Sequence, residues 1–82
     1  MYKIYTKDSC SYCTAAKELL RNKKQPFVEF TVGRDVTKEM LLEVVPHAHS
    51  VPQIFYNDDY IGGYDDLLER MKNDDPTRVL LG

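Results

Sequence analysis

The chain has 82 residues, of which 43% are hydrophobic and 29% charged, and its formal net charge is −2. A chain of this length forms one compact core, so we expect a single domain over residues 1–82. The absence of a basic cluster argues against binding to nucleic acid or to acidic membranes. No apolar run is long enough to span a bilayer, and no signal-peptide core precedes the first predicted strand. We therefore expect a cytoplasmic protein.

The first part of the chain predicts a strand, a helix and a second strand. Tyr2–Thr6 is rich in aromatic and β-branched residues and favours a buried strand. A helix follows, with Ser9 or a neighbour as its N-cap and with Pro26 preventing its continuation. Its expected inner face holds Tyr12, Ala15, Ala16, Leu19 and Leu20, and its outer face Lys17, Glu18 and Arg21. Residues 27–32 alternate Val28, Phe30 and Val32 with Glu29 and Thr31, as a strand does. This order predicts a right-handed βαβ unit with parallel strands.

The rest of the chain predicts a second helix, a hairpin and a third helix. Asp35 or Thr37 is the expected cap of the second helix, which Pro46 stops. Its expected inner residues are Met40, Leu41, Val44 and Val45. Gln53–Tyr56 and residues 60–61 flank a polar turn at 57–59, which predicts an antiparallel pair. The buried face of the third helix should hold Tyr64, Leu67, Leu68 and Met71, with residues 79–81 packing back as a short tail. The order β-α-β-α-β-β-α predicts an α/β fold, with helices on both faces of a four-stranded mixed sheet.

Both cysteines stand where the first strand gives way to the first helix, spaced as Cys10-Ser11-Tyr12-Cys13. A C-x-x-C pair near a βαβ unit is typical of thiol–disulfide exchange sites. The free N–H groups and partial positive charge of a helix N-terminus stabilise a thiolate. We therefore expect Cys10 to be the exposed nucleophile, with Lys7 adding a positive field. Cys13, one turn deeper, is then placed to attack a mixed disulfide on Cys10.

Two other interpretations of the cysteines are less favoured. A structural disulfide across two residues closes so small a loop that it restricts the unfolded chain very little. A zinc site can be written with Cys10, Cys13, His47 and His49. Structural zinc fingers, however, space their histidines three to five residues apart, and a domain with its own core has less need of a metal.

Two further segments suggest a binding groove. A proline directly before a strand, as in Val51-Pro52, can be cis and can present backbone groups to a peptide-like substrate beside the sulfurs. Gly62 and Gly63 precede the third helix and can expose N–H groups to a carboxylate, while Asp65 can bind an ammonium group. A ligand that carries both groups on one carbon, as an amino acid does, suits this corner.

Over nearly its whole length the chain resembles the glutaredoxins. The resemblance is carried by I-Y-T-K-D-S-C-S-Y-C at residues 4–13, S-V-P-Q-I-F at 50–55 and I-G-G-Y-D-D-L at 61–67. It implies a thioredoxin-like fold and a glutathione-dependent thiol–disulfide oxidoreductase. By the same resemblance Cys10 is the nucleophile and Cys13 the resolving thiol. The glutathione-binding residues are then Lys7, Tyr12, Val51, Pro52, Tyr64 and Asp65.

The resemblance also implies partners and alternatives. Glutathione and disulfide-bearing proteins are the expected partners, with ribonucleotide reductase as a plausible client and the protein itself a monomer. Ser11 stands where many dithiol members have proline, and some members with C-S-Y-C bridge a [2Fe–2S] cluster between two subunits. A cluster carrier that uses Cys10 as a ligand is thus one alternative, and a thioredoxin-like electron donor is another. The 46–49 loop lacks the family's usual glycine and basic residue, and Lys38 is a candidate substitute.

Overall fold

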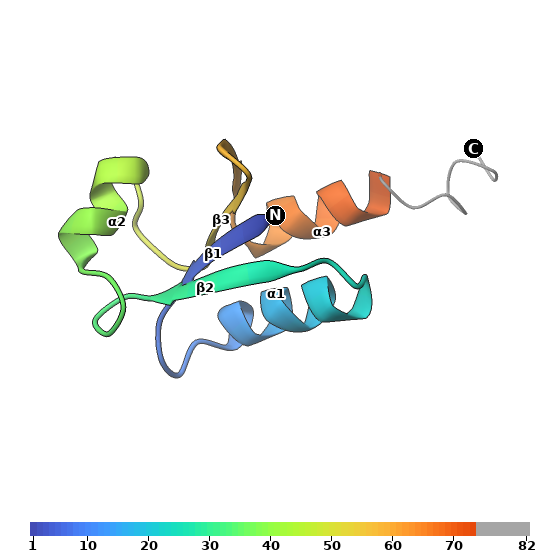
Figure 1. The fold of residues 1–82 in the computed structure, drawn as a ribbon, viewed down its shortest axis with the longest axis horizontal. Coiled ribbons are helices and arrows are strands. Elements are labelled where there is room, and N and C mark those ends of the chain that lie inside the picture. The colour runs from blue at the N-terminus through green and yellow to red at the C-terminus, as the bar shows by residue number, and fades with distance from the viewer. Residues whose placement is uncertain (74–82) are drawn as a thin grey trace.

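The computed structural model describes residues 1–73, and the predicted order of elements is confirmed within them (Figure 1). The strands are β1 (Tyr2–Thr6), β2 (Phe27–Thr31), β3 (Gln53–Tyr56) and β4 (Asp59–Gly62). The helices are α1 (Ser11–Asn22), α2 (Lys38–Val44) and α3 (Tyr64–Asn73). The expected tail at residues 79–81 lies outside the described residues.

The sheet is mixed and has the strand order β2-β1-β3-β4. β1 pairs in parallel with β2 and antiparallel with β3, and β3 pairs antiparallel with β4. The βαβ unit and the hairpin are therefore both confirmed. The hairpin turn is shorter than predicted, because Asp59 already pairs with Tyr56, and Asn57 takes a left-handed backbone conformation with φ of 55°.

The main core lies between one face of the sheet and the helices α1 and α3, which contact each other. Its buried residues are Tyr2, Ile4, Ala16, Leu20, Ile54, Leu67 and Met71. Burying one such large apolar side chain stabilises a fold by about 1.5–3 kcal/mol. Figure 1 shows α2 set apart from this pair. Val44 of α2 lines a small cavity with Lys3, Tyr5 and Phe55. Since these residues alternate along β1 and β3 with the core residues, α2 lies toward the opposite face of the sheet.

Several predicted inner residues face solvent instead. Tyr12 is 63% exposed, because the buried face of α1 is a narrower stripe of Cys13, Ala16 and Leu20. On α2, Met40 and Val44 are about half exposed, and only Leu41 and the following Val45 are buried. The two buried residues lie one helical turn apart, at i and i+4, and so form one narrow stripe along this seven-residue helix. The predicted inner face of α1 is therefore confirmed except at Tyr12, since Ala16 and Leu20 are buried and Leu19 packs against the core. The inner face predicted for α2 is wrong at Met40 and Val44.

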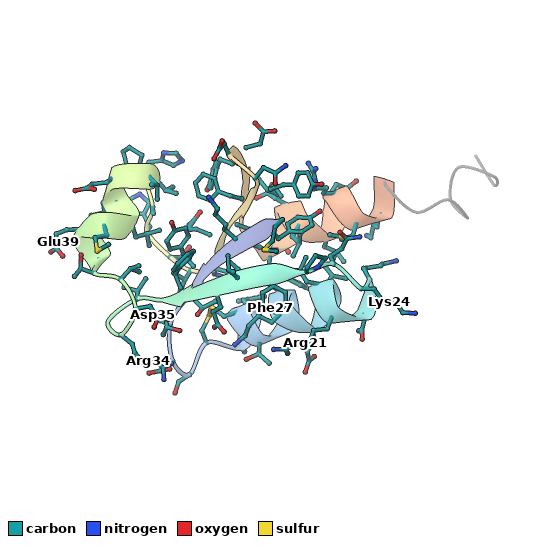
Figure 2. All side chains as sticks on the ribbon, in the orientation of Figure 1. Arg21, Lys24, Phe27, Arg34, Asp35 and Glu39 are labelled. Atoms are coloured by element: carbon teal, nitrogen blue, oxygen red, sulfur yellow. A yellow bond between two sulfur atoms is a disulfide. The ribbon has the colours of Figure 1, made fainter. Side chains whose placement is uncertain are left out.

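The alternation of β2 is present, but its polar face points toward the core side. Thr31 is buried, whereas Val28 is 40% exposed. Phe27 packs against the core cluster, and the Arg21 guanidinium of α1 lies 5.5 Å from its ring centre (Figure 2). On the other face, Phe30 stacks against Tyr5 with the ring centres 5.3 Å apart. Glu29, which shares the inner face with Phe27 and Thr31, is thereby directed toward α1.

Within residues 1–73, none of the helices combines the length and the apolar character that crossing a bilayer requires.

Candidate functional site

Cys10 and Cys13 form a disulfide at the N-terminus of α1, with their Cα atoms 5.2 Å apart. Cys10 is itself the N-cap: its backbone is extended, and its Sγ accepts a hydrogen bond from the Cys13 N–H at 3.2 Å. Ser9, the first cap we considered, precedes it in a left-handed conformation with φ of 58°. The cap position directs one of the free N–H groups of the helix at the Cys10 sulfur.

The two sulfurs lie in different surroundings. Cys10 is half-buried, whereas Cys13 is only 2% exposed and lies within the inner stripe of α1. Both line a cavity of about 440 Å³, which Lys7 also borders. A reagent from solvent therefore meets the Cys10 side of the disulfide more readily than the Cys13 side.

A second cavity, of about 390 Å³, gathers five residues that the sequence assigned to a glutathione groove. These residues are Tyr12, Val51, Pro52, Tyr64 and Asp65. The Val51–Pro52 peptide is cis, and the Val51 carbonyl oxygen lies 3.7 Å from the Cys10 Sγ, so this cavity adjoins the disulfide. The rings of Tyr12 and Tyr64 face each other with their centres 6.0 Å apart.

One backbone donor at the helix start of this groove is already used. Asp66 Oδ2 accepts a hydrogen bond from the Gly63 N–H at 3.1 Å. The glycine N–H that we expected to be free for an anion is therefore occupied, and the candidates that remain are the first-turn N–H groups of Tyr64 and Asp65. An acidic residue three positions after a helix-capping residue is a recognisable signal for this bond, and the sequence reasoning missed it.

Gln53 and Tyr60 support the loop that carries Val51 and Pro52, and neither was predicted to contribute. The Gln53 side chain is buried; its Nε2 donates to the Ser50 carbonyl at 2.8 Å, and its Oε1 accepts from the Tyr60 hydroxyl. Burial, and secondarily the negative charge of Asp66, raises the pKa of Tyr60. The phenol therefore stays protonated and able to donate at neutral pH.

A third cavity, of about 330 Å³, lies on the α2 side of Val51. Lys7 and Lys38 both line it, together with His49 and Ser50. Two ammonium groups around one small cavity favour an anionic group such as a carboxylate. The structure thus brings Lys38 beside the same opening as Lys7, although 31 positions separate them in the sequence.

At the cavity that both sulfurs line, three elements contribute to a small polar cluster. Glu29 Oε2 of β2 accepts hydrogen bonds from Thr6 Oγ1 of β1 at 2.6 Å and from Lys17 Nζ of α1 at 2.9 Å. The Thr6 hydrogen bond is the main cause that lowers the pKa of Glu29; burial opposes it, and the nearby Lys17 and Arg21 charges add to it. The sequence placed Lys17 on the outer face of its helix, so this prediction is wrong. Its long apolar stem lets the ammonium group reach back to the sheet.

The four residues of the considered zinc site do not form one in this structure. Cys10 and Cys13 are bonded to each other, and across residues 1–73 no three histidine, cysteine or acidic side chains come together as a metal site. His47 lies instead edge-on to the Tyr60 ring, with the ring centres 6.0 Å apart.

Three features together define the class of protein. They are the C-x-x-C disulfide at a helix start, the cis-proline loop beside it and the four-stranded mixed sheet. The protein is a thiol–disulfide oxidoreductase with the thioredoxin-like fold. The glutaredoxin family model matches residues 3–61. Glutaredoxin 3 of Escherichia coli is 40% identical over 65 residues, which cover 79% of this chain and 78% of that protein. The chain therefore belongs to the glutaredoxin family, whose members use glutathione.

Two further similarities agree with this assignment. A solution structure of glutaredoxin from Brucella melitensis superposes with a TM-score of 0.74 at 33% identity, covering 89% of this chain and 79% of that one. The hybrid peroxiredoxin hyPrx5 of Haemophilus influenzae is 41% identical over 64 residues. That match covers 78% of this chain but only 26% of the hybrid protein, so the chain corresponds to about a quarter of it.

Proposed function

We propose that this glutaredoxin exchanges electrons between glutathione and the disulfides or glutathione adducts of other proteins, with Cys10 as the attacking sulfur and Cys13 as the resolving sulfur. The single observation that supports this most strongly is the placement of the disulfide. Its outer sulfur adjoins a groove that suits an amino-acid-like ligand, and its inner sulfur is 2% exposed.

The groove accounts for each part of glutathione in turn. The backbone of Val51, beside Cys10, pairs with the cysteinyl residue and brings its sulfur to the disulfide. The first-turn N–H groups of α3 hold the γ-glutamyl carboxylate, and the Asp65 carboxylate holds the ammonium group. Pro52, Tyr12 and Tyr64 form the apolar walls between them. On the other side of Val51, Lys7 and Lys38 bind the glycyl carboxylate.

The reaction then follows from the different positions of the two sulfurs. In the reduced protein the Cys10 thiolate attacks the disulfide of a substrate and releases one of its thiols, which leaves a mixed disulfide on Cys10. The Cys13 thiolate attacks Cys10 Sγ, forms the intramolecular disulfide and releases the second thiol. Two glutathione thiols reduce the Cys10–Cys13 bond and leave as glutathione disulfide. Cys10 caps the N-terminus of α1, whose free N–H groups and partial positive charge stabilise a thiolate, so Cys10 is a good leaving group in these exchanges.

We place this reaction in the cytoplasm, where a glutathione pool keeps thiols reduced, and we assign it to a monomer. Ribonucleotide reductase, suggested by the family resemblance, is one protein client to assay. The [2Fe–2S] interpretation takes Cys10 as this chain's cluster ligand; none of the contacts around Cys10 favours it over thiol exchange, and it stays a prediction.

The test is turnover of a glutathionylated protein with glutathione as reductant, for the parent chain and its Cys10→Ser and Cys13→Ser variants. Cys10→Ser is expected to abolish turnover. Cys13→Ser is expected to retain reduction of the glutathione adduct and to lose reduction of an intramolecular protein disulfide. Turnover that survives in Cys10→Ser would contradict the assigned roles.

A further inference from the structure

We infer that the Lys17–Glu29 ion pair controls how fast Cys13 resolves a mixed disulfide on Cys10, with Lys17 promoting the step and Glu29 restraining it. This inference rests on the proposed function, since it takes Cys13 as the resolving sulfur. Neither the C-x-x-C chemistry nor glutathione binding in the groove requires these two charged side chains, so the inference gives them a function of their own.

The inner sulfur has little help from solvent. Cys13 is 2% exposed, and burial disfavours the thiolate that must attack Cys10. The resting Cys13 is a neutral thiol, so negative charge develops on its sulfur as it loses its proton and attacks, and part of this charge is still on Cys13 in the transition state. A fixed positive charge near Cys13 therefore accelerates the step, and a fixed negative charge slows it.

Lys17 and Glu29 are the charges placed to do this. Lys17 stands one helical turn after Cys13, at i+4 on the same side of α1, and the cavity that both sulfurs line is also lined by Lys17 and Glu29. The two side chains are 22% and 30% exposed, so solvent screens them less than it screens a surface pair. Thr6, itself buried, donates to the same Glu29 oxygen and fixes the carboxylate in place.

The lowered pKa of Glu29 supports a carboxylate that is ionised at neutral pH. Other charged groups face the same cavity from the loops around it: Lys7 and Asp8 before α1, and Arg34 after β2. Arg34 is paired with Asp8 at 2.8 Å, and these side chains are 64% and 77% exposed. Figure 2 shows Arg34 at the outer edge of its loop. Because Arg34 and Asp8 line the same cavity but are more exposed, variants of this pair serve as matched controls for variants of Lys17 and Glu29.

The resolving step requires only the two cysteines, the substrate sulfur and water. The Cys13 thiol gives its proton to water in the cavity, and its thiolate attacks Cys10 Sγ. The Cys10–Cys13 bond forms as the bond from Cys10 to the substrate sulfur breaks, and the electron pair leaves on that sulfur, which takes up a proton. Cys13 is oxidised and the substrate sulfur is reduced.

The test uses the reduced protein and an aromatic disulfide whose released thiol is coloured. Rapid mixing separates a first release, caused by attack from Cys10, from a second first-order release, caused by resolution from Cys13. Lys17→Met should slow the second release about three- to tenfold, and Glu29→Gln should accelerate it by a similar factor, as expected for one partly screened charge. The amide oxygen that Glu29→Gln introduces can still accept from Thr6 and Lys17, so this variant removes the charge and keeps the contacts.

The double variant Lys17→Met/Glu29→Gln should return close to the parent rate, and the controls Asp8→Asn and Arg34→Gln should change it less than about twofold. Unfolding midpoints confirm that each variant is folded. A slower second release in both single variants, or no change in either, would overturn the inference. A first release that persists in Cys10→Ser would instead overturn the proposed function, so the two failures are distinguishable.

Discussion

The surroundings of the two sulfurs differ in how they are built. Around Cys10, backbone groups and helix ends dominate: the cap of α1, the Val51 carbonyl and the first turn of α3. Cys13 borders a cavity with Lys17 and Glu29, and Glu29 is held by side chains from β1 and α1 that meet at one carboxylate oxygen. The outer sulfur is thus surrounded by short local motifs, which suit the recognition of a peptide-like ligand. The inner sulfur shares a cavity with a charged pair that tertiary contacts hold in place, which suits the tuning of its charge.

The outer site depends most on Gly62, where β4 meets α3. Gly62 has φ of +126°, and an added Cβ would clash with Asp66 Oδ2, the atom that caps Gly63. Gly62→Ala should therefore lower the free energy of unfolding by about 2–4 kcal/mol, measured by urea denaturation. Gly33→Ala is the matched control. Its φ is +93° with no atom within 4 Å of the added Cβ, so the expected loss is about 1 kcal/mol. Equal losses of stability in the two variants would mean that the clash with Asp66 does not contribute to the effect of Gly62→Ala.

The next largest effect is expected in glutathione binding. Asp65→Asn removes the charge that we assign to the glutathione ammonium group, and it should raise the KM for glutathione about tenfold with little change in kcat. Asp58→Asn removes another exposed carboxylate, from the hairpin turn and away from the groove, and should leave KM unchanged. A similar rise in both variants would show a general effect of net charge rather than a contact with the ligand.

The smallest expected effect is on the pH dependence of stability. The pKa of Glu29 is lower in the folded chain than its ordinary value of 4.5. Its ionised form therefore stabilises the fold fully above about pH 4.5, and this contribution is lost as the pH falls through the folded-state pKa.

Glu29→Gln should accordingly be less stable than the parent at pH 7, by about 0.5–1 kcal/mol, and the difference should narrow as the medium becomes more acidic. Urea denaturation at a series of pH values measures this difference. A difference that is constant with pH would contradict a lowered pKa for Glu29 in the folded state.

The sequence predicted well those features of the fold that short sequence motifs determine. Strand alternation, helix periodicity and the turn residues were sufficient for the element order and for the mixed sheet. The five residues predicted for the groove line one cavity, because they lie in three contiguous segments that the fold brings together. The sequence also made it possible to predict that Lys7 and Lys38 lie at one cavity. Each lysine follows one of the parallel strands β1 and β2, which end at the same edge of the sheet.

What the sequence did not predict depends on side chains that reach across the fold. Lys17 belongs to the outer face of α1 by periodicity, but a long flexible side chain is not confined to the face where its Cα lies. Glu29 alternates with apolar residues as a solvent-facing residue does, yet β2 turns that face toward α1. Tyr12 has helical spacing with the core residues but lies in the first turn, where its ring faces the groove instead.

The most direct test of the central claim is to ask which sulfur accepts glutathione. Reduced Cys13→Ser and Cys10→Ser proteins are mixed separately with glutathione disulfide, and the glutathione adduct is followed by intact mass. Our account predicts rapid addition of one glutathione to Cys13→Ser, at Cys10, and addition to Cys10→Ser slower by roughly a hundredfold or more, because the Cys13 sulfur is buried. Equal rates, or faster addition at Cys13, would contradict it.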